Sequence, residues 1–265
     1  MAVDSAGNIW VADTGNNRIR KLTPGPVAVE ETQPLSVVNS ASMLPGPVAP
    51  GEIVSIFGLG IGPVTPAGGT LDASGNVATE LAAARVLFNG TPAPLYYAQD
   101  SQINAQAPYE ISGASTVVVE VFFQGESRGN ATVAVAPSAP GIFTVSAGTG
   151  LAVALNQDGS LNSPVAPAHQ ASIVTLYATG EGLTNPASAD GEPAAAPYPA
   201  PAMPVTLAIG GYPAQILFAG EAPGYAGLLQ INARLPGGFA PTGNVPVVLS
   251  IASASSQPGV TIAVE

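Results

Sequence analysis

Apolar and polar residues alternate over many short stretches of this chain. In residues 229–235, Leu-Gln-Ile-Asn-Ala-Arg-Leu, every odd position is apolar and every even position is polar. A period of two places one face of a strand against a core and the other face in water. Asn-Gly at 89–90 and Gly-Gly at 210–211 precede aromatic-rich stretches, and such pairs favour two-residue hairpin turns. We therefore predict short antiparallel strands joined by tight turns.

Helical periodicity is nearly absent. No stretch keeps apolar residues at helical spacing over three turns, and one helical turn is predicted at residues 81–84. Short strands with frequent turn signals and almost no helix are typical of an all-β sandwich protein.

The second half of the chain repeats the first. Pro-Val-Ala-Pro occurs at 47–50 and at 164–167, each time before an apolar stretch that ends in glycines. Gln-Ile-Asn-Ala occurs at 102–105 and at 230–233, each time with a proline four residues after the Asn. Since the order of the matches is the same in both halves, we predict two tandem immunoglobulin-like β-sandwiches, residues 35–137 and 138–265, with Ile103 and Ile231 facing their cores. The paired strands are expected at 53–60 and 173–180, 95–98 and 216–219, 117–123 and 245–251, and 131–135 and 260–264.

Both halves resemble the IPT/TIG class of immunoglobulin-like domains. Residues 140–265 are also similar to an uncharacterised C-terminal module of large exported bacterial proteins. The segments that carry this similarity are 140–144, 156–164, 174–180 and 229–232. His169-Gln170-Ala171 departs from the module, which usually has a Pro-Gly turn there. The resemblance implies a sandwich fold and no assigned chemistry.

The first residues have a different character. Residues 3–22 are similar to the NHL repeat, a blade of the β-propeller fold, so we predict a partial blade at 1–24, with strands near 9–12 and 18–22, and a linker at 25–34. The edges of an isolated hairpin leave backbone groups unpaired. We expect this segment to dock on the first sandwich or to pair with another chain, with Trp10, Arg18 and Arg20 as candidate contact residues.

The charge balance restricts the possible partners. Only 9% of the residues are charged, and 6 Lys and Arg stand against 17 Asp and Glu. In residues 22–265 three bases face fifteen acids, a net charge of −12, which repels phosphate backbones and excludes nucleic acid as a partner. The chain has no cysteine, and no apolar run is long enough to span a membrane. The first residues lack the pattern of a signal peptide, so any export signal is expected upstream of Met1.

Motifs that suggest chemistry have simpler explanations. Residues 125–129 match the G-x-S-x-G nucleophile elbow, but predicted strands flank Ser127, which indicates a hairpin. His169 is the single histidine and is expected on a solvent-facing loop. Glycines at 58–62 and 180–182 are interpreted as strand ends rather than phosphate loops. Residues 72–76 and 156–160 favour hairpin turns over calcium loops, and a weak calcium site stays open.

Two polar pairs recur at equivalent places, Gln102 and Asn104 in the first copy and Gln230 and Asn232 in the second. Asn is depleted in strands, so its recurrence indicates a specific hydrogen bond. A structural clamp on a neighbouring loop is favoured over contact with a ligand.

These observations predict a non-enzymatic module without cofactor or metal. It would serve as a spacer, adhesion or assembly domain at the cell surface or outside the cell, within the C-terminal part of a larger exported protein, and would make protein–protein contacts. Two alternatives stay open. The chain could be a subunit of an extracellular filament joined by strand addition, or an accessory, glycan-binding domain of a secreted carbohydrate-active enzyme.

Overall fold

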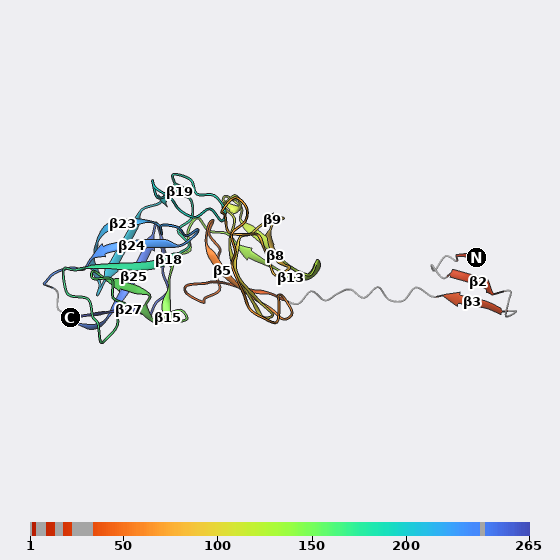
Figure 1. Ribbon diagram of the computed structural model, residues 1–265, viewed down its shortest axis with the longest axis horizontal. Coiled ribbons are helices and arrows are strands. Elements are labelled where there is room, and N and C mark those ends of the chain that lie inside the picture. Colours follow the sequence, from red (N-terminus) through yellow and green to blue (C-terminus); the bar gives the residue numbers. More distant parts are fainter. Residues whose placement is uncertain (1, 4–8, 14–17, 23–33, 239–241) are drawn as a thin grey trace. The chain divides into compact units, whose positions relative to one another are not determined.

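The computed structural model describes residues 2–3, 9–13, 18–22, 34–238 and 242–265. The chain divides into two compact units, Met1–Thr32 and Gln33–Glu265. In the described residues the regular structure is β, apart from a short 3₁₀ helix, η2 (Tyr109–Ile111). The predicted all-β class is therefore confirmed (Figure 1).

The first unit contains a three-stranded antiparallel sheet in the order β1-β2-β3. Its strands are β1 (Ala2–Val3), β2 (Ile9–Asp13) and β3 (Arg18–Leu22), and the last two confirm the strands expected at 9–12 and 18–22. The side chains of Trp10, Arg18 and Arg20 lie outside the described part of the chain, as do residues 25–33 of the predicted linker. The contacts expected of this segment stay a prediction.

Residues 34–137, called sandwich 1 below, form two five-stranded sheets. One has the order β4-β5-β11-β10-β6, with β4 (Ser36–Asn39), β5 (Ile53–Phe57), β6 (Ala67–Gly68), β10 (Leu95–Gln99) and β11 (Gln102–Gln106). The other has the order β13-β12-β8-β7, with β9 on β8: β7 (Glu80–Leu81), β8 (Ala84–Phe88), β9 (Thr91–Pro92), β12 (Thr116–Phe123) and β13 (Glu126–Ala134).

Residues 138–265, called sandwich 2, repeat this arrangement. One sheet has the order β14-β18-β24-β23, with β17 on β18: β14 (Gly141–Ile142), β17 (Ala154–Asn156), β18 (Ile173–Thr179), β23 (Gln215–Glu221) and β24 (Leu229–Arg234). The other has the order β15-β16-β27-β25-β21-β22, with β26 on β25: β15 (Thr144–Ser146), β16 (Thr149–Ala152), β21 (Val205–Ile209), β22 (Tyr212–Pro213), β25 (Gly243–Ile251), β26 (Ala254–Ser255) and β27 (Val260–Val264). A separate two-stranded sheet joins β19 (Thr184–Asn185) and β20 (Ala200–Pro201).

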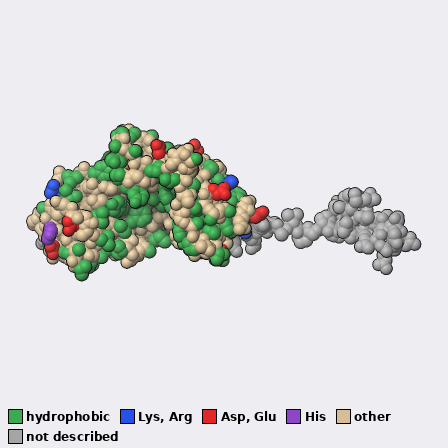
Figure 2. Space-filling view, viewed as in Figure 1, with side chains coloured by type: hydrophobic (Ala, Val, Ile, Leu, Met, Phe, Trp, Pro, Cys, Tyr) green, Lys and Arg blue, Asp and Glu red, His purple; other side chains and the backbone are tan. Residues whose placement is uncertain are grey.

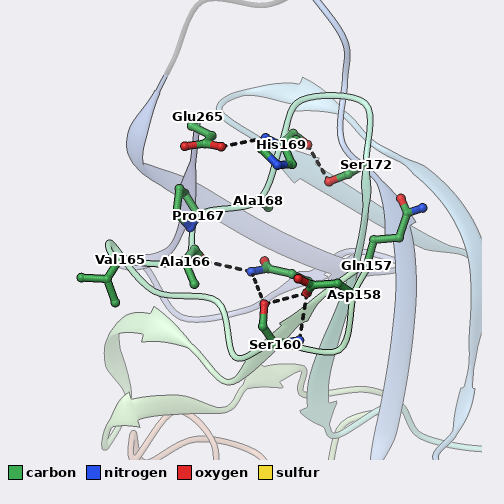
Figure 3. A pocket seen from close by; sticks show the side chains of 11 residues that line it. Gln157, Asp158, Ser160, Val165, Ala166, Pro167, Ala168, His169, Ser172 and Glu265 are labelled. Atoms are coloured by element: carbon green, nitrogen blue, oxygen red, sulfur yellow. Dashed lines mark hydrogen bonds and ion pairs between the residues drawn. The ribbon is translucent and has the colours of Figure 1, made fainter.

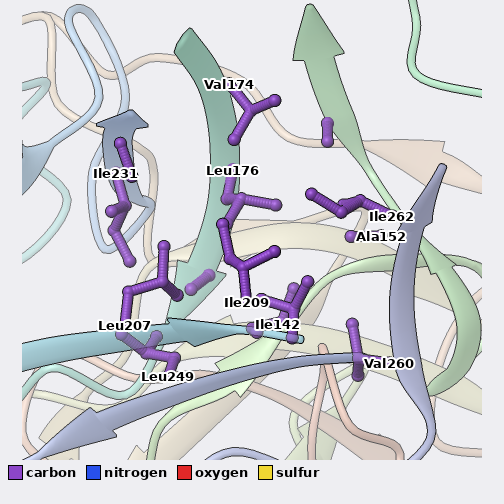
Figure 4. Close-up of a cluster of buried hydrophobic side chains, with 14 of the residues drawn as sticks. Ile142, Ala152, Val174, Leu176, Leu207, Ile209, Ile231, Leu249, Val260 and Ile262 are labelled. Carbon is purple, nitrogen blue, oxygen red and sulfur yellow. The ribbon is translucent and has the colours of Figure 1, made fainter. Parts of the chain in front are cut away.

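Each sandwich has its own apolar core. Ile103 belongs to the core of sandwich 1 and Ile231 to that of sandwich 2, and both side chains are 0% exposed. Figure 4 shows the second core, where Val174 and Leu176 of β18 and Ile231 of β24 lie among side chains of the opposite sheet. The predicted burial of both isoleucines is confirmed, because alternation along a strand sends every second side chain to the same face.

The tight turns agree with the sequence at two places and correct it at a third. Both residues have positive φ in Asn89-Gly90 and in Gly210-Gly211. Positive φ at both central positions is the signature of the type I′ hairpin that such pairs favour. The helical turn predicted at 81–84 is wrong. Ala82 and Ala83 have φ of 48° and 65° and connect β7 to β8 as a hairpin, because pairing of the flanking strands overrides the helical preference of alanine.

The two copies of Pro-Val-Ala-Pro occupy different environments. Val48 is 2% exposed and forms a bridge with Val135, whereas Val165 is 94% exposed. In sandwich 2 the corresponding bridge joins Ala168 to Val264. The repeated tetrapeptide thus marks the duplication without marking equivalent positions in space.

Candidate functional site

The recurring polar pairs lie on the strands β11 and β24, next to the buried isoleucines. Gln102 Nε2 donates a hydrogen bond to Asn104 Oδ1 at 2.8 Å, and Gln230 Nε2 donates to Asn232 Oδ1 at 3.0 Å. All four side chains are partly exposed. Each pair therefore forms the same bond along its own strand, on the face opposite the core.

The partner of this pair in sandwich 1 is a strand rather than a loop. Ser55 Oγ of β5 donates to Asn104 Oδ1 at 3.1 Å, and the same hydroxyl lies 2.8 Å from Ser40 Oγ. The prediction that this pair clamps a neighbouring loop is therefore wrong for sandwich 1. Asn104 accepts its bond from a strand, because it lies directly opposite Ser55 in the β5–β11 register.

A larger polar site lies where the two sandwiches meet, and no motif in the sequence indicated it. The backbone N–H of Ile53 donates to Thr179 Oγ1 at 2.8 Å, and Tyr96 Oη donates to the carbonyl of Ala226 at 2.8 Å. The side-chain amide of Asn39 donates to the carbonyl of Ala139 at 3.0 Å. These bonds join elements of sandwich 1 to sandwich 2 and to residues 137–141, the linker between the sandwiches.

The segment 183–203 of sandwich 2 extends this contact. Asp190 Oδ1 accepts a hydrogen bond from the backbone N–H of Tyr109 at 2.9 Å. The N–H of Gly191 donates to Gln106 Oε1 at 2.7 Å, and its carbonyl accepts from the N–H of Val77 at 2.8 Å. The insertion between β18 and β21 therefore attaches one sandwich to the other through the backbone of Gly191 and the side chain of Asp190.

Three glutamates are buried in this contact. Glu52 comes from the turn before β5, Glu181 follows β18, and Glu221 ends β23; their exposures are 0%, 0% and 2%. Glu52 Oε2 accepts from the N–H of Ala49 at 2.7 Å, and Glu221 Oε1 accepts from Tyr109 Oη at 2.8 Å. Glu52 Oε1 and both carboxyl oxygens of Glu181 are buried without a hydrogen-bond partner.

Burial shifts the ionisation of these acids in one direction. It raises the pKa of Glu52 to about 8 and that of Glu181 well above its usual range, because a charged carboxylate loses its hydration there. Charge repulsion from Glu221 and Glu52 adds to the rise of the Glu181 pKa. Burial also raises the pKa of Glu221 and of Asp190. The contact thus gathers carboxyls that resist ionisation.

Two glycines around Glu181 allow the close approach of the linker. Gly180 and Gly182 have φ of 84° and 81°, and a Cβ on either would overlap a carbonyl oxygen of the linker, that of Ala139 or that of Pro137. The motif at 180–182 therefore does more than end a strand. It holds the linker against sandwich 2 and places Glu181 in the contact.

A second concave surface lies on sandwich 2, with a volume of about 670 Å³ (Figure 3). His169 Nδ1 and Glu265 Oε1 are 2.7 Å apart, and their side chains are 78% and 53% exposed, which confirms His169 as a solvent-facing residue. Ser172 Oγ donates to the backbone carbonyl of His169 at 2.6 Å, so its proton is directed away from the imidazole. Asp158 Oδ1 accepts from the N–H and hydroxyl of Ser160, and these bonds lower the pKa of Asp158.

The remaining motifs lie in turns and strands. Ser127 is exposed in β13, just after the hairpin that turns at Gln124-Gly125. Asp72 Oδ1 accepts from the N–H groups of Ser74 and Asn76, a local pattern that stabilises a turn. Across the described residues, His, Asp and Glu form no group of three placed to bind a metal ion.

The turn at His169-Gln170-Ala171 has a left-handed residue at the same place as the corresponding turn of sandwich 1. Ala171 has φ of 61°, close to the 75° of Gly51 in the corresponding turn of sandwich 1. An alanine there takes a conformation that glycine adopts more readily.

The charged side chains of the surface are sparse, and Figure 2 shows them as scattered patches on a face that is otherwise apolar and neutral polar. The described residues contain no helix of the length and apolarity that a membrane crossing requires.

Sequence reasoning missed the three interfacial glutamates. Glu181 stood out only as an acid between two glycines. Glu52 aligns with Ser172, and Glu221 aligns with Asp100, which is exposed. One weak signal was available, since an acid directly before or after an apolar strand is uncommon in a chain with 9% charged residues.

Similarity to known proteins is limited. The family model described as NHL repeat matches residues 1–22. Curated proteins include no match to this chain. Among solved structures, one described as the full extracellular region of plexin A4, domains 1 to 10, has 12% sequence identity and a TM-score of 0.27. The match covers 93% of this chain and 17% of that chain, so this chain spans less than a fifth of the length of that protein. Sequence similarity to a described family is therefore found at the NHL-like segment of the chain.

Proposed function

We propose that this chain is a non-enzymatic structural and binding module of an exported protein, in which two IPT/TIG-like sandwiches form one stiff spacer outside the cell. The observation that carries the proposal is the hydrogen-bonded contact between the sandwiches. Tandem domains joined only by a linker move independently. Here side chains and backbone groups of both domains bond across the contact, at Ile53, Tyr96 and Tyr109.

The side chains with catalytic potential favour the same proposal. Activation of a serine nucleophile needs a base within hydrogen-bond reach. Ser127 is exposed in a hairpin strand, and the Ser172 hydroxyl donates to a carbonyl instead. His169 is the single imidazole of the chain and pairs with Glu265.

Filament assembly by strand addition is a second candidate, because β3 of the first unit pairs with β2 alone among the described strands. An unpaired strand edge is a template for another chain. A glycan-binding role has less support. Among the described residues, the lining of the concave surface around His169 contains no Phe, Tyr or Trp, although these side chains are frequent in small-molecule sites.

Calorimetric unfolding of the full chain tests the stiff spacer. We expect the two sandwiches to unfold in a single transition, and Gly182→Ala to separate it into two or to lower its midpoint, because the new methyl group would overlap the Pro137 carbonyl. The matched control is Gly159→Ala. Gly159 has a similar φ of 83°, and a Cβ there meets nothing within 4 Å, so this variant carries the backbone strain alone. Two transitions in the unaltered chain would show independent domains and end the proposal.

A further inference from the structure

In the part of the chain that the structure describes, the contact between the sandwiches contains acids from both sides and no Lys or Arg that pairs with them. Glu181 has neither carboxyl oxygen hydrogen-bonded, and Glu52 has one oxygen without a partner, both at 0% exposure. Removing a charged carboxylate from water costs several kcal/mol unless it is paired. These two groups therefore need another means of neutralisation.

The arginines of the two sandwiches do not supply it. The Arg128 guanidinium donates to the Phe123 carbonyl and lies over the Phe123 ring, 5.7 Å from its centroid. Arg234 donates to the Ala171 carbonyl, and Arg85 is exposed on β8. A proton on each carboxyl is the simplest neutralising partner that the site allows, since the described acids form no metal-binding group of three.

We propose that the contact between the two sandwiches is a proton-controlled joint, which is closed while Glu52 and Glu181 are protonated and loosens when they ionise. The geometry places the two acids for this role. Glu52 precedes the strand whose first N–H bonds to Thr179, and Glu181 follows Thr179 by two residues. Both cores, by contrast, are apolar clusters, so ionisation acts on the joint before it acts on either sandwich.

A small cavity borders the contact on the side of sandwich 2. The cavity, of about 170 Å³, is lined by Ser188, Glu192 and Glu221, among others. Glu221 is bonded to Tyr109 of sandwich 1, so this cavity opens beside a residue that spans the joint.

The neighbouring acids all act in the same direction. Burial raises the pKa of Glu181, the backbone N–H groups of Glu181 and Gly180 lower it in part, and the charges of Glu221 and Glu52 raise it further. Burial raises the pKa of Glu52, and hydrogen bonds from the Ala49 N–H and the Asn39 side chain oppose this in part. Burial also raises the pKa of Tyr96 and that of Tyr109. The pKa of Asp190 is raised by burial and then by the charge of Glu110, and that of Glu221 by burial and then by the charge of Glu192. The titratable groups around the pair are Tyr96, Tyr109 and Glu110 from sandwich 1 and Asp190, Glu192 and Glu221 from sandwich 2.

The sign of the pH effect follows. Glu52 has a pKa of about 8 in the folded protein against 4.5 as the reference value, so the folded state binds more protons between these values. The free energy by which protonated Glu52 stabilises the closed joint is fully present below pH 4.5 and is lost as the pH rises through about 8. The joint is therefore expected to close in acid and to loosen in mild alkali.

Distance measurement by pulsed electron paramagnetic resonance tests this in the full chain. The chain has no cysteine, so Thr132→Cys and Thr206→Cys, both exposed and one on each sandwich, can carry the two spin labels. We expect one narrow distance distribution at about pH 5 and a broader one at about pH 9, which lies above the Glu52 pKa. In E52Q/E181Q, which mimics the protonated acids, the distribution should stay narrow at both pH values.

The control is E80Q/E126Q, which removes the same number of charges from exposed positions of sandwich 1 and should broaden as the unaltered chain does. An unaltered chain whose distribution is the same at both pH values overturns the proposal, as does broadening of E52Q/E181Q in alkali. Restoration of the narrow distribution by calcium chloride at the higher pH would assign the neutralising role to a cation and equally overturn it.

Amide hydrogen exchange of the unaltered chain gives an answer that does not depend on the folding of a variant. The amides of Ile53 and Tyr109 donate across the joint, whereas that of Ile103 lies in the β5–β11 ladder. Between the two pH values we expect the protection factors of Ile53 and Tyr109 to fall at least tenfold relative to that of Ile103. Equal changes at all three amides contradict a joint that opens separately from the sandwiches.

Discussion

Individual residues in this protein differ most in how they are buried. Ile103 and Ile231 are buried by their place in an alternating strand, among side chains of like polarity. Glu52 and Glu181 are equally buried, but at the contact between two domains and with oxygens that lack partners. The first kind of burial stabilises the fold, and the second makes stability depend on protonation.

Truncation of a core residue measures how much burial in an apolar core stabilises the fold. Ile231→Ala should lower the free energy of unfolding by about 2–5 kcal/mol, because it removes buried methyl groups and leaves a cavity. Urea denaturation followed by circular dichroism gives this value. Val248→Ala, on a strand of the same sandwich but 40% exposed, is the control and should change the free energy by less than about 1 kcal/mol. A similar small loss for both would mean that Ile231 is not part of a packed core.

The strands and turns show where local preference yields to pairing. Asn89-Gly90 fits its type I′ hairpin, since both residue types tolerate positive φ. Ala82-Ala83 holds the same conformation with two alanines, at a steric cost of about 1–2 kcal/mol per residue. The pairing of β7 with β8 and their place in the sheet compensate for this cost.

Exchange of the turn residues tests that interpretation. Replacing Ala82-Ala83 with Asn-Gly should stabilise the protein by about 1 kcal/mol, because the left-handed conformation is then natural to the residues. Gly90→Ala should destabilise it by about the same amount, since no atom lies within 4 Å of the added methyl and only the backbone strain remains. Thermal melts of both variants beside the unaltered chain measure the two shifts. Destabilisation by Asn-Gly at 82–83 would contradict a hairpin there.

At the scale of the whole molecule, two similar sandwiches form one compact unit from Gln33 to Glu265. The linker at 137–141 does not separate them, because Gly180 and Gly182 admit it closely and the segment 183–203 bonds to sandwich 1. The duplicated sequence therefore builds two domains, while hydrogen bonds across the contact and the insertion join them.

The NHL-like segment has its own test. Deletion of residues 1–24 should reduce the oligomer size if the strand edges of this segment pair with another chain. Light scattering of the deleted and intact chains, at equal concentration, measures the difference. Limited proteolysis of the intact chain is the companion measurement, and protection of the segment is expected. Equal monomeric size for both chains, with immediate cleavage of the segment, would exclude a role in assembly.

The sequence by itself determined the elements and their duplication. Alternation at 229–235 predicted which residues of β24 are buried, and Asn-Gly at 89–90 predicted a hairpin, because both depend on residues close together in the chain. The NHL similarity at 1–22 was also readable without a structure.

The tertiary structure alone decided what the repeats do together. Glu52 and Glu181 are more than 120 residues apart in the sequence, and neither lies in a pattern that predicts burial. Their environment arises only when the second sandwich packs on the first. The same holds for the two copies of Pro-Val-Ala-Pro, of which one valine is buried and the other exposed. Local periodicity indicates which face of a strand is apolar, whereas the neighbours of that face, and the ionisation of groups between domains, depend on contacts that form across the fold.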